Sequence, residues 1–162
     1  MLDCPPMSPE REQEIGLQIM SRRWFPVTPD YAFRAFTQPM FLRQWWKPEA
    51  YAVLRLEFPT REGEDYLVRL RSPAGTSFAH TGTVIAWERP SLIAYTWRWI
   101  DGPFFGAETL VEIAFTPERD GVMVDVRHSR FMSQEDCDRH AAWFDVMAAL
   151  AAWLLTPLRP GE

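Results

Sequence analysis

The chain has 162 residues, of which 47% are hydrophobic and 24% charged, and this composition is typical of one globular domain and excludes a disordered chain. Its net charge of −5 opposes a phosphate-binding surface, because nucleic-acid affinity comes largely from clustered cations, so we expect no nucleic acid among its partners. Aromatic residues make up 14% of the chain, which suits both a dense core and the lining of a small-molecule pocket.

Composition also sets the expected domain and its location. Residues 1 to 14 carry prolines and charges without a hydrophobic period, which predicts a disordered N-terminal tail before a single domain over residues 15 to 158. No apolar stretch opens the sequence, and the run from Val146 to Leu155 is shorter than the roughly 18 residues that suggest a membrane span. We therefore expect a cytoplasmic protein without membrane contact.

Three elements are predicted in the first third of the chain. Residues 16 to 27 alternate between apolar and polar side chains, which indicates a strand. A short helix follows, which Thr28 or Asp30 can cap and whose first turn suits Pro29. Residues 40 to 46 predict a second short helix that ends before a proline.

The rest of the chain predicts a meander of strands and one long helix. Recurrent turn motifs divide the region after the short helices into strands. Six of them are expected, at about 51–58, 65–72, 77–88, 92–100, 108–116 and 122–131. Ser133 can cap a helix of about 22 residues, because apolar side chains then recur every three or four positions.

This order of elements indicates an α+β helix-grip fold. A curved antiparallel sheet of about seven strands would wrap around the long C-terminal helix, with two short helices after the first strand. A strongly twisted sheet and a single helix cannot touch everywhere, so we expect a cavity between them whose mouth lies near the short helices.

Strand alternation predicts which side chains line that interior. In the strand LIAYTWRWI every second residue is aromatic or aliphatic, and the same rule applies to the strands that follow. The inward side chains include Ile93, Tyr95, Trp97, Trp99, Ile113, Val126 and His128. Such a lining suits an apolar or aromatic molecule, although the same stripes also suit a solid core.

Histidine offers the most versatile chemistry in the predicted interior. His128 is the one candidate for acid or base catalysis, and its alternative is a buried ring satisfied by the backbone or by Tyr95. His140 either frames the cavity or caps the packing of the last helix, and His80 lies on a different strand. No metal spacing, phosphate loop or dinucleotide turn occurs, so we expect neither a metal site nor a cofactor.

Several segments together resemble a known family. They are Phe33–Pro39, Phe41–Pro48, Ala94–Trp99, Val126–Phe131 and His140–Trp143. In this order they are similar to the START-like, birch-pollen-allergen-like (SRPBCC) superfamily, and within it to the bacterial branch named after the activator of the 90-kilodalton heat-shock chaperone ATPase.

The resemblance covers about residues 16 to 155 and implies a helix-grip fold with a ligand cavity in a binding or stress-associated protein. The resemblance does not identify a catalytic residue, because the branch has no agreed active site. It also does not imply that the chain activates a chaperone, since that activity belongs to larger eukaryotic proteins with an additional domain. Ala142 replaces the family's glycine before Trp143 and adds a methyl group where the helix faces the sheet.

Three functional hypotheses remain. The favoured one is a non-enzymatic protein that binds a small apolar or aromatic molecule between the sheet and the C-terminal helix. The expected ligand-binding residues are Tyr95, Trp97, Trp99, Ile113, Val126, His128, His140, Trp143, Phe144 and Met147, with Trp45 and Trp46 at the mouth or anchoring the short helix. The alternatives are a polyketide cyclase-like or hydrolase-like enzyme that uses His128, and a homodimeric protein-interaction module.

Overall fold

The computed structural model describes residues 17–48, 50–101, 108–140 and 143–154, without the side chains of 136, 139 and 143–146. Its main element is an antiparallel sheet with the strand order β1-β7-β6-β5-β4-β3-β2. The strands are β1 (Leu17–Phe25), β2 (Ala52–Glu57), β3 (Asp65–Arg71), β4 (Ser77–Glu88), β5 (Leu92–Asp101), β6 (Thr109–Glu118) and β7 (Gly121–Phe131). The seven predicted strands are thus confirmed, whereas the predicted tail lies outside the described residues.

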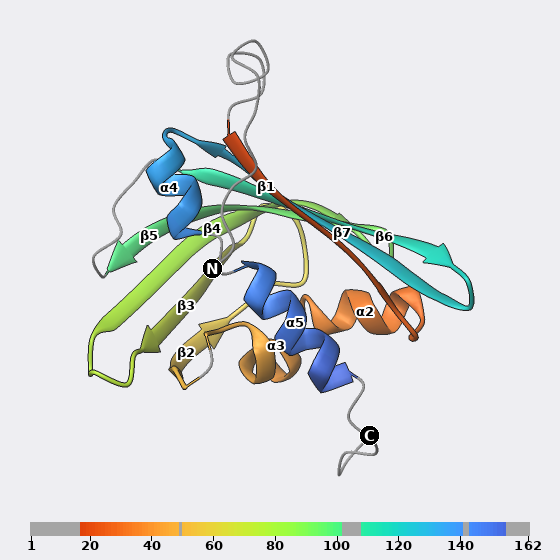
Figure 1. The fold of residues 1–162 in the computed structure, drawn as a ribbon, viewed down its shortest axis with the longest axis horizontal. Coiled ribbons are helices and arrows are strands. Elements are labelled where there is room, and N and C mark those ends of the chain that lie inside the picture. Colours follow the sequence, from red (N-terminus) through yellow and green to blue (C-terminus); the bar gives the residue numbers. More distant parts are fainter. Residues whose placement is uncertain (1–16, 49, 102–107, 141–142, 155–162) are drawn as a thin grey trace.

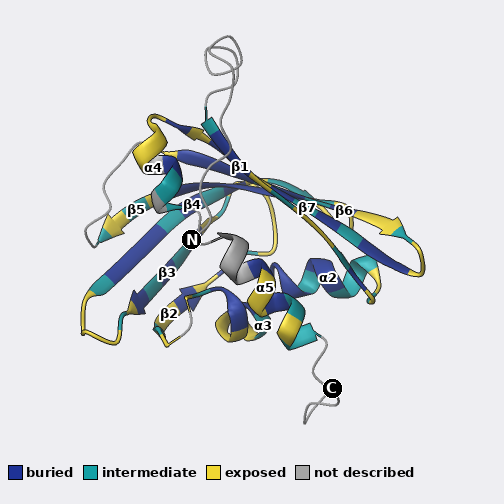
Figure 2. Cartoon of the chain, viewed as in Figure 1, coloured by how far each residue is buried: buried dark blue, intermediate teal, exposed yellow. Residues whose placement is uncertain are grey.

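The sheet is curved, and its concave side holds the helices α2 (Pro29–Ala35), α3 (Pro39–Trp45) and α5 (Trp143–Leu154) (Figure 1). This arrangement confirms the helix-grip fold. The central strands are buried along most of their length, and exposed residues gather at the strand tips and on the outer sides of the helices (Figure 2). The core therefore lies between the concave sheet and the helices, which is where a site would be enclosed.

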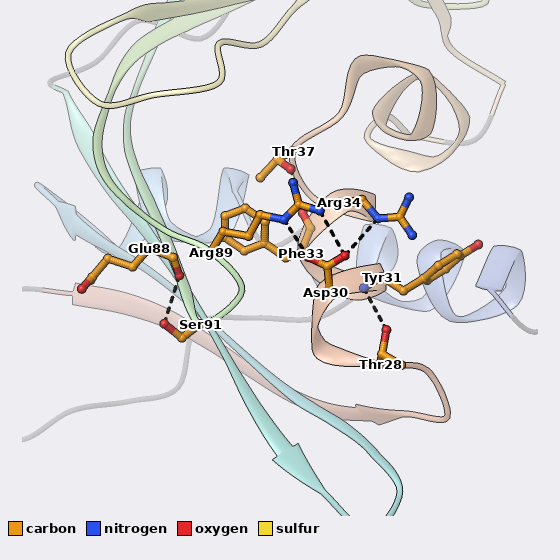
Figure 3. Close-up of polar contacts among 9 residues, drawn as sticks. All are labelled: Thr28, Asp30, Tyr31, Phe33, Arg34, Thr37, Glu88, Arg89 and Ser91. Carbon is orange, nitrogen blue, oxygen red and sulfur yellow. Dashed lines mark hydrogen bonds and ion pairs between the residues drawn. The ribbon is translucent and has the colours of Figure 1, made fainter.

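Capping fixes the start of α2. The Thr28 side chain accepts a 3.1 Å hydrogen bond from the backbone N–H of Tyr31, and Pro29 occupies the first turn. Asp30 does not cap the helix but pairs with Arg89 beyond β4 and with Arg34 on the same helix (Figure 3). The hydrogen bond from Arg89 holds the pKa of the Asp30 carboxyl below its usual value.

The C-terminal region differs from the single long helix expected from the sequence. The structure has α4 (Gln134–Arg139) and then α5, because the His140 N–H bonds to the carbonyl of Cys137, three residues back, where α4 ends. Figure 1 shows α4 at one end of the sheet and α5 inside its curve. Apolar periodicity continues across both helices, so it gave no sign of the break. No helix in the described part of the chain is long and apolar enough to cross a membrane.

Candidate functional site

All three histidines of the chain lie close together, and one of them is the residue that follows α4. His80 comes from β4, His128 from β7 and His140 from the turn after α4, and they surround Trp97 and Trp99 of β5. The His80 ring stacks on Trp97 with ring centres 3.7 Å apart, and the His128 centre lies 5.4 Å from Trp97 and 5.2 Å from His140. We call these five residues the histidine–tryptophan cluster.

A buried phenol orients the His80 ring. The hydroxyl of Tyr66 on β3 lies 3.1 Å from Nδ1 of His80. Burial raises the pKa of Tyr66 well above its usual value, with smaller contributions from Tyr95 and Glu108, so the phenol keeps its proton. The neutral phenol and the neutral ring of His80 therefore share a hydrogen bond at Nδ1, and the tautomer of His80 sets its direction.

Thr109 on β6 orients the His128 ring. Its hydroxyl donates to the backbone carbonyl of Trp97 across 3.2 Å and lies 2.7 Å from Nε2 of His128. A hydroxyl carries one hydrogen, so with that hydrogen on the carbonyl its oxygen accepts from Nε2–H. Thr109 is thus a hydrogen-bond partner of His128 that the sequence analysis, which named the backbone or Tyr95, did not include.

His140 is held by an indole. The Nε1–H of Trp99 donates a 2.8 Å hydrogen bond to Nε2 of His140. An indole nitrogen only donates, so Nε2 of His140 carries no proton and the neutral ring has its hydrogen on Nδ1. His140 and Trp99 are partly exposed, unlike the other members of the cluster.

The two buried histidines of the cluster are uncharged at neutral pH. The side chains of His80 and His128 are 2% and 0% exposed, and this burial lowers the pKa of both rings well below 6.5. The positive charge of protonated His140 lowers the pKa of each ring further. Within the described ranges, no three His, Cys, Asp or Glu side chains are arranged to hold a metal ion.

Aromatic side chains extend the cluster into the core. Trp46 follows α3 and is 3% exposed, with ring centres 5.2 Å from His80, 5.9 Å from Trp97 and 5.9 Å from Tyr95. Trp45 donates its indole N–H to the backbone carbonyl of Ala35 across 2.8 Å. Trp45 thus anchors α3 to α2, and Trp46 packs against the inner face of the sheet.

The remaining predicted site residues divide into two groups. Buried along the inner side are Tyr95, Ile113, Val126 and Met147. The side chains of Trp143 and Phe144 lie outside the description, so their role as the roof of a cavity stays a prediction. Sequence reasoning missed His80, Tyr66 and Thr109, although the period-two rule applied to β4 turns His80 inward with Phe78.

A surface hollow of about 560 Å³ lies at the far end of the sheet. It is formed by the β1–α2 connection and the β6–β7 turn, and its lining residues are Val27, Thr28, Pro29, Pro117, Glu118, Arg119, Asp120 and Gly121. No aromatic or histidine side chain lines it, so the histidine–tryptophan cluster is the stronger candidate site.

Comparisons with known proteins agree with this fold. The family model for Activator of Hsp90 ATPase homolog 1-like protein matches residues 26–154. The AHSA1 protein of Silicibacter pomeroyi is 27% identical, with a TM-score of 0.76 over 85% of this chain and 96% of that one. A protein of Chromobacterium violaceum is 24% identical, with a TM-score of 0.74 over 86% and 97% of the two chains. A comparison with curated proteins finds no match.

Proposed function

The chain belongs to the family of Activator of Hsp90 ATPase homolog 1-like proteins, and from this premise we propose that it binds a small apolar or aromatic molecule. The molecule would lie between the inner face of the sheet and α5, with the histidine–tryptophan cluster at its polar end. One observation carries the proposal: three histidines, two of them buried and uncharged, converge with two indoles on one part of the sheet. Convergent polar groups in an apolar surround are typical of ligand sites.

The competing interpretation is a solid core. His80, His128 and His140 each have a hydrogen-bond partner, so packing alone also accounts for their positions. The binding-site interpretation is favoured because these hydrogen-bonded side chains lie together in one part of the sheet. Hydrophobic residues would fill a core without hydrogen bonds that have to be satisfied. The stress-associated role and the cytoplasmic location stay predictions.

Binding can be measured with N-phenyl-1-naphthylamine, an uncharged aromatic probe whose fluorescence rises in apolar surroundings. We expect a saturable rise at one probe per chain, with energy transfer from the tryptophans. Native mass spectrometry of the freshly purified protein will show whether a small molecule is retained. A filled core gives neither saturation nor a retained molecule, and that result would contradict the proposal.

A matched pair of variants locates the probe. Val126 and Val122 are both buried on the same face of β7, where Val126 is two residues from His128 and Val122 is six. Val126→Phe should weaken probe binding at least about tenfold by filling the space, whereas Val122→Phe should leave it unchanged. Circular dichroism checks the fold of each variant, and Val126→Ile with Val122→Ile is the milder pair if the larger ring prevents folding.

The two alternative functions can be judged in the same experiments. Thr109 gives His128 the polar neighbour that an enzyme would need, so a retained molecule should be compared before and after incubation for chemical change.

The homodimer hypothesis rested on exposed aromatic side chains. Among the residues described, the exposed large hydrophobic side chains are Met20, Met40, Leu54, Ile85, Ile100 and Met132, none of them aromatic. Light scattering measures the oligomeric state directly.

A further inference from the structure

We propose that the ligand carries an uncharged acceptor oxygen, such as the carbonyl of a ketone or an ester, and that the Tyr95 hydroxyl donates a hydrogen bond to it. This inference rests on the proposed function and specifies the chemistry of its ligand. The carbonyl would lie beside the histidine–tryptophan cluster, because Tyr95 is two residues from Trp97 on the same face of β5. The rest of the ligand would be apolar.

The Tyr95 hydroxyl is a buried polar group that the described part of the chain does not satisfy. Tyr95 is 1% exposed, and none of the described residues makes a hydrogen bond with its hydroxyl. Its backbone pairs with Val84 of β4 and Val111 of β6, so it lies within the sheet and away from both edge strands. A buried hydroxyl without a partner costs stability, whereas a phenylalanine ring would fill nearly the same space without this cost. A ligand oxygen would supply the missing partner.

The rings around Tyr95 leave the role of acceptor to a ligand. The ring centre of Tyr66 lies 5.2 Å from that of Tyr95, but its hydroxyl shares a hydrogen bond with Nδ1 of His80. The centres of Trp46 and Phe58 lie 5.9 Å and 5.5 Å from that of Tyr95. An indole can only donate, and a phenyl ring has no conventional donor or acceptor, so neither of these two rings can accept from the phenol.

Burial favours an uncharged oxygen over a carboxylate at this position. It raises the pKa of Tyr95 well above the usual value, so the phenol keeps its proton and can donate. A carboxylate would lose its hydration in exchange for one hydrogen bond from a neutral group, which is costly for a buried charge. The negative charge of Glu108, which also raises the pKa of the neighbouring Tyr66, adds to this cost. A ketone or ester carbonyl loses less hydration, and one hydrogen bond satisfies it.

The test uses 2-acetylnaphthalene and 2-isopropenylnaphthalene as competitors of N-phenyl-1-naphthylamine. The two compounds have nearly the same shape, but the second has a CH2 group in place of the carbonyl oxygen. Tyr95→Phe should weaken the ketone about tenfold without weakening the hydrocarbon, because only the ketone loses a hydrogen bond. The ratio of the two affinities, compared between wild type and variant, cancels their difference in hydrophobicity. An unchanged ratio, or no displacement of a bound probe by the ketone, would overturn the inference.

Tyr51→Phe is the matched control. It also removes one hydroxyl, but from a partly exposed tyrosine whose ring packs against Phe78 with centres 5.6 Å apart. This variant should leave the ratio of the two affinities within about twofold of the wild-type value. Circular dichroism checks that both variants keep the fold. An equal change of the ratio in both variants would contradict the assignment to Tyr95.

Infrared spectroscopy detects the proposed hydrogen bond in the wild-type protein, so this measurement does not depend on the folding of a variant. The carbonyl band of carbon-13-labelled 2-acetylnaphthalene should lie at a lower frequency in the complex than in an apolar solvent, because the carbonyl accepts a hydrogen bond. In Tyr95→Phe the band should return towards its position in the apolar solvent. A band at that position in the wild-type complex would overturn the inference.

An anion of similar shape tests the requirement for an uncharged group. We expect 2-naphthoate to displace the probe less well than 2-acetylnaphthalene does at about pH 7.5. Stronger displacement by the naphthoate would contradict the choice of an uncharged oxygen.

The two proposals fail differently. If N-phenyl-1-naphthylamine itself does not bind, the proposed function is wrong. If this probe binds but Tyr95→Phe leaves the ratio of the two affinities unchanged, the site exists and Tyr95 does not donate to its ligand.

Discussion

The indole N–H of Trp99 donates a 2.8 Å hydrogen bond to Nε2 of His140, a residue 41 positions away in the sequence. This bond ties β5 to the turn after α4. It exists only while Nε2 is unprotonated, because an indole cannot accept in return. The bond therefore links β5 directly to the segment that follows α4.

The hydrogen bond between Trp99 and His140 predicts a change at Trp99 when His140 is replaced. In His140→Phe the indole N–H of Trp99 loses the Nε2 acceptor, so its nuclear magnetic resonance signal should shift. Trp99→Phe identifies that signal by its absence. An indole signal that stays in place in His140→Phe would contradict the hydrogen bond.

The buried rings of His80 and His128 predict a loss of stability in mild acid. Burial first, and then the charge of His140, lowers the pKa of both rings in the folded state. Below about pH 6.5 the unfolded chain binds more protons than the folded chain, so stability is present above that pH and lost as the pH falls. Urea denaturation should show a decrease of up to about 1.4 kcal/mol per pH unit for each ring.

Single variants provide the control for this prediction. His80→Gln or His128→Gln removes one of the two titrating rings, so the slope of stability against pH should fall by about one proton. The variants will be less stable than the wild type at about pH 7.5, but less sensitive to acid. A wild-type free energy of unfolding that stays constant from about pH 7.5 to 5.5 would contradict the neutral buried state.

Local sequence patterns predicted the strands well, because alternation and turn residues are properties of adjacent positions. They predicted Trp97 and Trp99 on the inner face for the same reason. The meeting of His80 with the cluster depends on the register that places it opposite Trp99 on the neighbouring strand. Register arises from pairing between separate segments of the chain, which a single sequence does not reveal.

Trp45→Phe should destabilise the protein by about 1 to 3 kcal/mol. The phenyl ring can still pack on Phe36, whose ring centre is 4.7 Å from that of Trp45, but the buried carbonyl of Ala35 loses its donor. Trp24→Phe is the matched control, since its N–H donates to the partly exposed carbonyl of Glu118, where water can replace it. Urea denaturation of both variants measures the difference in the free energy of unfolding. An equal loss of stability would show that the buried hydrogen bond contributes no more than the partly exposed one.

Gly82 allows β4 to approach β5 closely behind the cluster. A Cβ atom at this position would lie 1.7 Å from the carbonyl oxygen of Thr96 and 2.8 Å from the ring of Tyr66. The neighbouring Thr83 N–H also donates to the Thr96 hydroxyl across 2.8 Å, which holds the two strands at this distance. No side chain fits here without displacing backbone.

Gly82→Ala should therefore cost on the order of 3 kcal/mol or more, and it should disturb the ring of Tyr66 that orients His80. Gly75→Ala is the control, because it meets no atom within 4 Å and costs only the strain of a φ of +87°, about 1 kcal/mol. Urea denaturation gives the two free energies, and near-ultraviolet circular dichroism reports the aromatic packing. If the two variants lose similar stability, β5 can move away from β4 at little cost, and the close approach does not hold the cluster in place.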